Sequence, residues 1–379
     1  MAGPVIGLAN FKKQWAESRE AYQAAIERVG QSGWLILGSE VAAFEADLSA
    51  HWGLAHAVGC ASGLDALELA FRCLGMQAGD LVLTTPLSAF ATTLAIVRVG
   101  AVPVFADVDE SGQLDLQHAA MVLKTLPQKA RFVVPVHLFG HALNLNAIEA
   151  FALRHELVIV EDCAQAIGAR SGGRAVGSLA PVCATSFYPT KNLGAFGDAG
   201  ALLTNDPAIN ALARSLRDYG QSAKYVHSEL GLNSRLDELQ AALLRSVQLP
   251  ALKAQTERRR VIAARYQANL RNAALALVPV PAESESVWHL FPVLVKNAAS
   301  RAAFQAHLKG HGIESAVHYP KLIPDQPAMA KTRWLGAGGD ALPRARQFAE
   351  TEVSLPMHPF LTEAEVQQVI EACNSWEAP

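Results

Sequence analysis

The segment VCATSFYPTKNLGAFGDAGALLT, from Val182 to Thr204, holds the most informative pattern in this sequence. Its first part, Val182 to Phe187, is an apolar run that predicts a buried strand, and Ala199 to Thr204 predicts a second strand. A glycine-punctuated turn between them carries one lysine, Lys191. Burial at a strand end lowers the pKa of a lysine and favours the neutral amine, which attacks carbonyl groups. The segment therefore indicates Schiff-base chemistry, and we expect other segments to supply partners for Lys191.

Short apolar runs alternate with helical patterns from about residue 55 to residue 205. This alternation predicts an α/β fold with a mostly parallel seven-stranded sheet and helices on both faces. The candidate strands are His56–Cys60, Leu81–Thr85, Val102–Asp107, Arg131–Leu138, Leu157–Glu161, Val182–Phe187 and Ala199–Thr204. Because ligands of such sheets bind at the carboxyl ends of strands, polar residues at these ends are the candidates for a site.

The pattern changes after Asp206. A long helix is expected from Arg235 to Leu270, interrupted near Pro250, and its charged run ERRR at residues 257–260 is expected to face solvent. Strands over 287–295 and 315–319 and helices over 301–311, 343–350 and 362–373 follow. The sequence therefore predicts a large domain over residues 1–250 and a smaller α+β domain over residues 251–379.

The composition is typical of a globular enzyme. The 379 residues have a formal net charge of -3, with 51% hydrophobic and 18% charged residues. No basic stripe favours nucleic acid, and the most apolar stretch is too polar for a membrane span. The first residues lack the pattern of a signal peptide, and the five cysteines have no metal-binding spacing. These features predict a cytoplasmic protein with reduced thiols and no metal.

The end of the first predicted strand indicates an anion site. In ASGLDAL, residues 61–67, a strand turns into a helix, which exposes the backbone N–H groups of Gly63 and Leu64 beside the hydroxyl of Ser62. Free N–H groups and the helix dipole favour a phosphate monoester at such a helix N-terminus. An ordinary helix cap formed by Ser62 explains the same residues equally well.

A carboxylate follows another apolar strand, in VIVEDCAQA at residues 158–166. Burying Asp162 there requires a cationic partner, and the protonated nitrogen of a pyridine ring is one. Such a ring withdraws electrons from a bound substrate, and Gln165 is placed to hydrogen-bond the ring hydroxyl. A helix cap or a structural ion pair is the alternative role of Asp162. Together, Lys191, Asp162 and the anion site predict a site for pyridoxal 5'-phosphate.

Three further residues are candidates for the cofactor site. Ser186, at the strand end before Lys191, can add a hydroxyl to the phosphate. Phe90, in TPLSAF, can stack on the pyridine ring, although an ordinary core position is the alternative. Asn233, in GLNSR, is expected to cap the following helix or to present its amide to a phosphate.

With these motifs assembled, the chain resembles the DegT/DnrJ/EryC1/StrS family of sugar aminotransferases. The resemblance extends over nearly the whole chain, from SGWLILG at residues 32–38 to SLPMHP at residues 354–359. It rests on an ordered set of four motifs, Ser62–Leu67, Glu161–Ala166, Ser186–Gly200 and Gly231–Gln240. It implies a fold-type I pyridoxal phosphate enzyme that acts on nucleotide-linked keto-sugars.

The resemblance also implies roles for individual residues. Lys191 would hold the cofactor and move protons, while Asp162 would pair with the ring nitrogen. Asn233 would reach the cofactor phosphate of a neighbouring subunit, which implies a homodimer with shared sites. Ser62, Gly63 and Ser186 would bind phosphate, Gln165 the ring hydroxyl, and Tyr188, His318 and Tyr319 the substrate.

The resemblance points to L-glutamate as amino donor and to C3 of a dTDP-linked keto-deoxysugar as acceptor, because GLDAL and GLNSRLDELQ are typical of such members. Amination at C4 or of a non-nucleotide ketone such as a cyclitol stays open, since Leu322 and Pro324 depart from the family pattern near the substrate. A sugar dehydratase is disfavoured, because it would carry histidine in place of Lys191. A cofactor-binding regulator is the non-enzymatic alternative.

Overall fold

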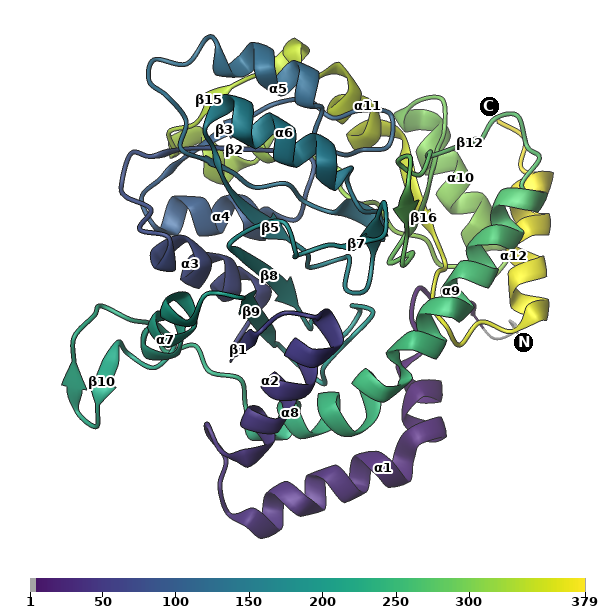
Figure 1. Cartoon of the computed structure of the whole chain (residues 1–379). Helices are drawn as coiled ribbons and strands as arrows, with labels where there is room; N and C mark the ends of the chain where they lie inside the picture. Colours follow the sequence, from purple (N-terminus) through teal and green to yellow (C-terminus); the bar gives the residue numbers. More distant parts are fainter. Residues whose placement is uncertain (1–4, 379) are drawn as a thin grey trace.

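The large sheet of this protein contains all seven strands that the sequence predicts between residues 55 and 205. The computed structural model describes residues 5–378; residues 1–4 and 379, which belong to the two predicted domains, lie outside this range. Eight strands form the sheet in the order β1-β9-β8-β5-β4-β2-β3-β15, with helices packed on both faces (Figure 1). The strands are β1 (His56–Cys60), β2 (Leu81–Thr84), β3 (Val102–Phe105), β4 (Phe132–Val133), β5 (Val158–Asp162), β8 (Val182–Ser186), β9 (Gly200–Thr204) and β15 (Leu335–Gly336). The predicted α/β class is confirmed, and β9 is the one strand of this sheet antiparallel to its neighbours.

Alternation along the central strands divides the core between the two faces of the sheet. Val82 packs on one face with Leu67 and Ile96, whereas Leu81 and Leu83 point to the opposite face. Successive strand residues point to opposite sides, so strands that are apolar throughout need cover on both. The first part of the chain supplies the helices α1 (Phe11–Ser32), α2 (Ser39–Trp52), α3 (Gly63–Cys73), α4 (Phe90–Arg98), α5 (Leu116–Leu123), α6 (Leu145–His155) and α7 (Pro207–Leu216).

Two differences from the predicted sheet, at β4 and at the edge of β3, involve prolines. The predicted strand over residues 131–138 shortens to β4, because Pro135 has no N–H to donate and interrupts the ladder, which continues only as a single bridge between Val136 and Asp162. The eighth strand, β15, pairs with Val104 and Phe105 of β3. Val102 donates its N–H towards β2, to Asp80 O at 2.8 Å, so by alternation the missing N–H of Pro103 falls on the outer side. A proline on that side is compatible with the short pairing of β15.

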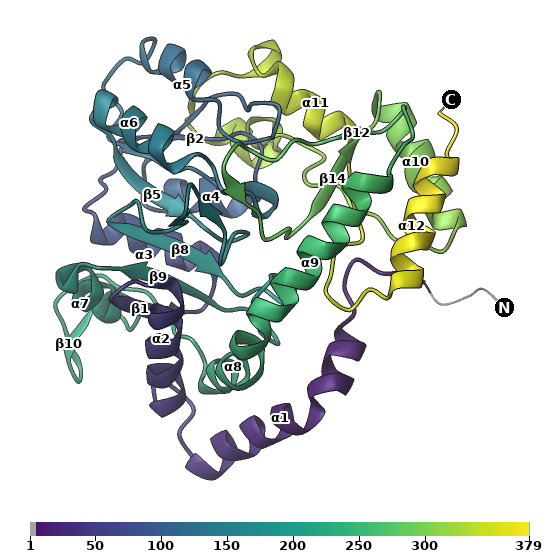
Figure 2. The ribbon, with the colours of Figure 1, turned by 45° about the vertical axis from the view of Figure 1, so that its right-hand side comes forward.

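A long helix joins the two parts of the chain, as Figure 2 shows. It runs through α8 (Glu238–Leu243), a π-helical turn (Leu244–Gln248) and α9 (Leu249–Asn269). The predicted interruption near Pro250 takes the form of this π-helical turn: the chain stays helical, but the α-helical pattern is broken over Leu244–Gln248. The proline stands in the first turn of α9, directly after the π-turn, where a missing N–H is tolerated.

The C-terminal part contains a small antiparallel sheet and three helices. The sheet has the order β12 (Ala276–Leu277), β14 (Phe291–Leu294) and β16 (Glu352–Leu355), and the helices are α10 (Ala298–Gly310), α11 (Pro343–Thr351) and α12 (Glu363–Ser375). The predicted strand over residues 315–319 reduces to a single bridge between Ala316 and Ser354. Ile6 packs into the core of this part, and β15 joins the large sheet. The domain division at residue 250 stays a prediction.

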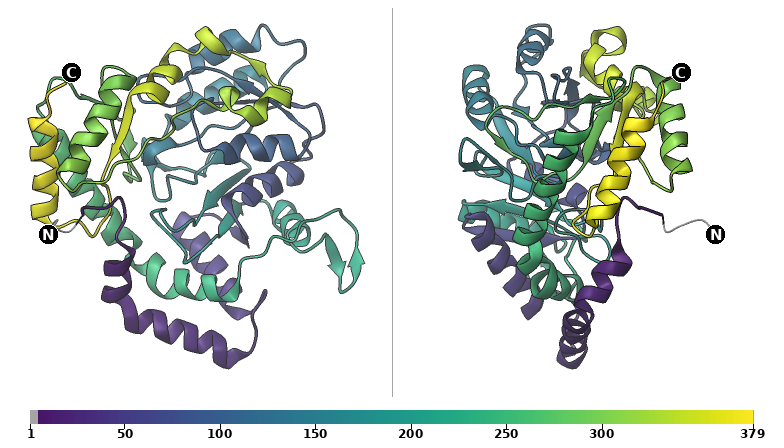
Figure 3. Two further views of the ribbon diagram at one scale, coloured as in Figure 1. Left: turned by 180° about the vertical axis from the view of Figure 1, so that it is seen from behind. Right: turned by 90° about the vertical axis from the view of Figure 1, so that its right-hand side faces the viewer.

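The remaining segments lie at the surface. Figure 3 shows α1 extended along α8, where Tyr22, Ala25 and Val29 pack against Ala242 and Leu243. A three-stranded sheet contains β6 (Arg170–Ser171), β7 (Arg174–Ala175) and β13 (Ser284–Glu285), and β10 (Gln221–Ala223) pairs with β11 (Val226–His227). Among the helices of residues 5–378, none has the length and apolar character needed to cross a bilayer.

Candidate active site

Lys191 lies in the turn after β8, with its backbone N–H bonded to Tyr188 O at 2.8 Å. The turn needs glycine at position 194, because a Cβ there would lie 2.3 Å from Pro189 O. The Lys191 side chain is only partly exposed. Burial lowers the pKa of its amine to about 8, although the nearby Asp162 carboxylate opposes this shift. A substantial neutral fraction near pH 8 agrees with the nucleophile expected from the sequence.

Three strand ends meet closely around the predicted phosphate site. Ser62 caps α3 by accepting the N–H of Asp65 at 3.1 Å, so the cap role is confirmed and its O–H remains able to donate. A Cβ on Gly63 would lie 2.6 Å from Cβ of Ser186, and a Cβ on Gly200 would lie 2.4 Å from the carbonyl carbon of Ser62. Glycine is therefore required where the backbones approach, and the resulting cradle of hydroxyl and N–H groups suits a phosphate.

Asp162, the last residue of β5, is 4% exposed, and its hydrogen-bond partners are uncharged. Its Oδ2 accepts the hydroxyl of Thr92 at 2.8 Å, and its Oδ1 accepts the N–H of Ala164 at 3.0 Å. Within residues 5–378 no arginine, lysine or histidine forms a salt bridge with this carboxylate, which removes the ion-pair alternative there. A buried carboxylate of this kind fits the protonated nitrogen of a pyridine ring.

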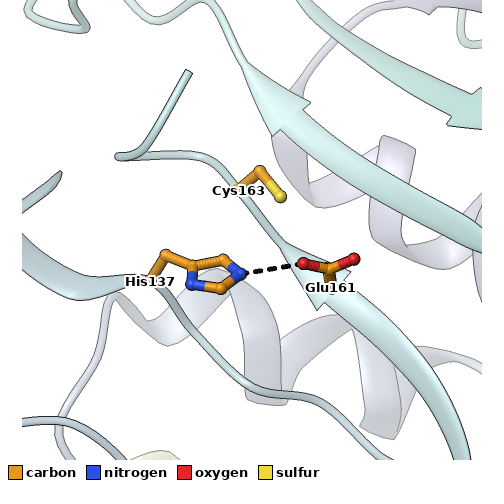
Figure 4. Close-up of side chains that lie close together, drawn as sticks. All are labelled: His137, Glu161 and Cys163. Carbon is orange, nitrogen blue, oxygen red and sulfur yellow. Dashed lines mark hydrogen bonds and ion pairs between the residues drawn. The ribbon is translucent and has the colours of Figure 1, made fainter. Parts of the chain in front are cut away.

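Glu161, next to Asp162, braces the strand from the opposite face, together with His137 (Figure 4). The Nδ1 atom of His137 accepts the N–H of Leu143, so Nε2 carries the proton and donates to Glu161 at 3.1 Å. The Glu161 carboxylate also accepts three backbone N–H groups, those of Gly177, Leu179 and Ala180. Burial raises the pKa of Glu161, but these donors outweigh it and hold the pKa below its usual value.

Cys163 completes a close group with His137 and Glu161 that resembles a metal site by composition. The histidine nitrogens and the carboxylate oxygens already have protein partners, and burial raises the pKa of the Cys163 thiol. Metal ligands need free lone pairs and a thiolate, so this group is a structural brace for β5. The sequence analysis did not identify it, because His137 lies in a loop without a recognisable motif.

Gln165 and Tyr319 meet beside this edge of the sheet. Gln165 accepts the N–H of Phe139 at 2.7 Å and donates to the hydroxyl of Tyr319 at 3.1 Å, which leaves its second amide hydrogen available. Phe90 begins α4 and packs against the cluster that contains Phe105. The contacts of Gln165 and Phe90 with a pyridine ring stay predictions.

His318 belongs to a buried chain of polar groups on the substrate side. The hydroxyl oxygen of Ser354 lies 2.5 Å from Oε1 of Glu352 and 2.9 Å from Nδ1 of His318, within hydrogen-bond distance of both. Glu352 also accepts the backbone N–H of His318 at 2.6 Å. Burial, aided by Lys191, lowers the pKa of His318 to about 4, whereas burial raises the pKa of Glu352 to about 8. At neutral pH His318 is therefore neutral.

Two predicted residues lie away from this group, and one expectation is corrected. Asn233 is exposed and does not cap the next helix, because α8 begins only at Glu238, with Asp237 at the cap position. Tyr188 is 52% exposed. The contribution of Asn233 to a neighbouring subunit and that of Tyr188 to substrate binding stay predictions.

A second correction concerns the charged run at residues 257–260. Arg259 does not face solvent: it is 6% exposed, and its Nη1 donates to the backbone oxygen of Met357 at 2.5 Å. The sequence gives no sign of this burial, because charged neighbours surround Arg259 on both sides. Arg259 belongs to the wall of a pocket beside Lys191.

Comparison with known proteins agrees with this arrangement. The profile of the DegT/DnrJ/EryC1/StrS aminotransferase family matches residues 16–374. The chain belongs to this family. It is 40% identical over 367 residues to "Pleiotropic regulatory protein" of Geobacillus stearothermophilus, with 97% of each chain covered. It is 41% identical over 375 residues to dTDP-3-amino-3,4,6-trideoxy-alpha-D-glucose transaminase of Streptomyces venezuelae, covering 98% of this chain and 96% of that one.

The fold of this aminotransferase is also that of solved structures. The structure of DesV from S. venezuelae in complex with a ketimine intermediate matches with a TM-score of 0.93 and 40% identity, over 99% of each chain. The family member described here is a pyridoxal phosphate-dependent aminotransferase, and the fold-type I prediction is confirmed. When bound, the cofactor supplies an electron sink for proton removal at the substrate carbon.

Proposed function

We propose that this aminotransferase transfers an amino group from L-glutamate to C3 of a dTDP-linked keto-deoxysugar. The support for the acceptor comes from relatives named as transaminases of dTDP-3-amino sugars, with 41% and 39% identity over nearly the whole chain. The observation that carries the proposal within this chain is the meeting of Lys191, Asp162 and the Ser62–Gly63–Ser186 cradle at one edge of the sheet.

The residues divide the chemistry between them. The neutral amine of Lys191 takes a proton from the donor carbon and returns one to the acceptor carbon in the second half of the cycle. Thr92 and the N–H of Ala164 fix the orientation of the Asp162 carboxylate, which would pair with the ring nitrogen of the bound cofactor. The cradle of Ser62, Gly63 and Ser186 fixes the phosphate, and neutral His318 contributes a polar side chain to the pocket beside Lys191.

We further propose a cytoplasmic homodimer with shared sites. Large apolar side chains are exposed along one stretch after α1, with Trp34 62% and Leu35 63% exposed. Leu230, close to Asn233, is 90% exposed. Exposed apolar groups of this kind mark protein interfaces, and such an interface would bring the Asn233 amide to a neighbouring phosphate.

The test is amination of a panel of ketones by the protein loaded with pyridoxamine phosphate. The panel contains dTDP-3-keto and dTDP-4-keto deoxysugars, the corresponding UDP sugars and a keto-cyclitol, and mass analysis reports each product. Amination of the dTDP-3-keto sugar alone supports the proposal. If the protein prefers another ketone of the panel, that ketone takes the place of the proposed acceptor. The keto-cyclitol tests whether Leu322 and Pro324 change the class of substrate.

A separate spectrum tests the regulator alternative, which the name of the Geobacillus relative raises. L-glutamate should bleach the absorbance of the lysine-bound cofactor in a working transaminase. A stable spectrum, with no amination of any ketone, would favour binding without catalysis.

A further inference from the structure

The pocket beside Lys191 combines apolar walls with basic and amide side chains and carries no acidic side chain. It has a volume of about 150 Å³ and is walled by residues 8–14, the turn after β8, one face of α9 and residues 355–360. Asparagine, glutamine and histidine side chains line it together with Lys191 and Arg259, and its lining includes no aspartate or glutamate. A concave site with fixed positive charge and amide groups selects an anionic ligand.

Arg259 supplies that positive charge in an unusual setting. It is 6% exposed, and its Nη1 donates to the backbone oxygens of Met357 and Trp288. Within residues 5–378 it forms no salt bridge with a carboxylate, and its Nε and Nη2 have no protein hydrogen-bond acceptor. Burial lowers the pKa of Arg259 to about 10, so the group stays charged at neutral pH. A buried guanidinium without a counter-ion is costly unless a ligand provides one.

Gln255 stands one helical turn before Arg259, so the two side chains share the face of α9 that lines the pocket. Within the described part of the chain the Gln255 amide makes no hydrogen bond. The same pocket is lined by His289, His318 and His358, whose pKa values are all lowered by burial. At neutral pH these histidines are uncharged, so the positive charges of the pocket are those of Arg259 and of the protonated fraction of Lys191.

We propose that Arg259 and Gln255 bind a carboxylate of the amino-acid donor in this pocket. A guanidinium binds a carboxylate through paired N–H groups, and the adjacent amide adds a third donor. A water molecule needs roughly 10–15 Å³ by this measure of volume, so the pocket has room for a molecule of about ten non-hydrogen atoms, such as glutamate. The inference rests on the amino-acid donor of the proposed function and is independent of which ketone is aminated.

The test measures binding of glutarate, a dicarboxylate without an amino group, to the cofactor-loaded protein by calorimetry. Arg259→Gln should weaken glutarate binding by at least about tenfold, since it removes charge-assisted hydrogen bonds. The matched control is Arg258→Gln on the same helix, whose guanidinium already bonds Glu363 and the backbone of Leu361. The control should bind glutarate like the wild type.

A second variant distinguishes loss of the guanidinium group from misfolding. Arg259→Lys keeps the charge but not the paired donors, and it should bind glutarate with intermediate affinity. Steady-state kinetics add an independent readout: KM for L-glutamate should rise in both Arg259 variants, whereas KM for the ketone substrate should stay within twofold. Wild-type protein that does not bind glutarate, or folded Arg259 variants with unchanged glutarate affinity, would overturn the inference. Binding of dTDP is measured on the same variants. Arg259 variants that lose dTDP binding but retain glutarate binding would overturn the inference as well.

The same variants separate this inference from the proposed function. Conversion of the loaded wild-type protein by a simple alkylamine as fast as by L-glutamate refutes the amino-acid donor itself, and the carboxylate site with it. Conversion by L-glutamate with equal KM in the wild type and in Arg259→Gln refutes only the site. Conversion by L-glutamate with a raised KM in Arg259→Gln supports both.

Discussion

Replacing Gly63 by alanine tests the phosphate cradle directly. The added Cβ would lie 2.6 Å from Cβ of Ser186, whereas ordinary contacts begin at 3.4 Å, so the two segments must separate by about 0.8 Å. A hydrogen bond of about 2.9 Å stretched by that amount is lost. Each hydrogen bond to a charged group contributes about 1.5–3 kcal/mol, so losing one should weaken cofactor binding by about 10–150-fold.

The assay is titration of the cofactor-free protein with pyridoxal phosphate, followed by absorbance, with thermal unfolding in parallel. The matched control is Gly310→Ala in α10, where an added Cβ meets nothing within 4 Å. It should leave cofactor affinity unchanged. Adding Ser186→Gly to Gly63→Ala removes the hydroxyl and the 2.6 Å contact and leaves a 3.2 Å contact with Cα of residue 186, so thermal stability should recover in part while affinity stays low. Wild-type affinity and unfolding in Gly63→Ala would refute the cradle.

Two more predictions concern ionisable groups. With a pKa of about 8 for Lys191, the rate of cofactor attachment should rise about tenfold per pH unit below pH 8 and then level off. Borohydride reduction followed by peptide mapping should find the label on Lys191. The Lys191→Ala variant should show neither label nor turnover. Labelling of another lysine would contradict this role. Burial raises the pKa of Glu352 from 4.5 to about 8, so the folded state holds a proton that the unfolded state has released between these values. The stability that this proton gives is present below pH 4.5 and should fall by about 1.4 kcal/mol per pH unit up to pH 8. Glu352→Gln should lack this part of the pH dependence in urea unfolding between pH 6 and pH 8, and parallel curves for the two proteins would argue against a buried, protonated Glu352.

The fold was predictable because its determinants are local. Apolar runs such as Val182–Ser186 and the helical pattern after Gly63 identify strands and helices without knowledge of the partners. The candidate cofactor residues could be chosen from the sequence because they follow strand ends in order, and their contacts with a cofactor stay predictions. Their meeting at one edge is a property of parallel sheets, which brings Ser62, Asp162 and Ser186 together.

The parts that escaped prediction depend on long-range packing. Arg259 lies among charged residues, and only the approach of Met357 and Trp288 from distant segments buries it. His137 braces Glu161 from a loop whose course is set by Pro135 and a 3-10 turn (Leu138–Gly140) rather than by periodicity. Asn233 has the residue type of a helix cap, but its backbone pairs with Asp218 instead. Side-chain type alone cannot reveal such pairings.

The late position of β15 has a consequence for how the chain is made. On the ribosome, β3 emerges long before Leu335 and Gly336, so newly made chains expose Val104 and Phe105 as an open strand edge. Such an edge invites association with other nascent chains. Pro103 limits this risk, because it removes one N–H donor from the exposed side of β3 until β15 has been synthesised. Chains that terminate before residue 335 should therefore need chaperones more than the full-length product does.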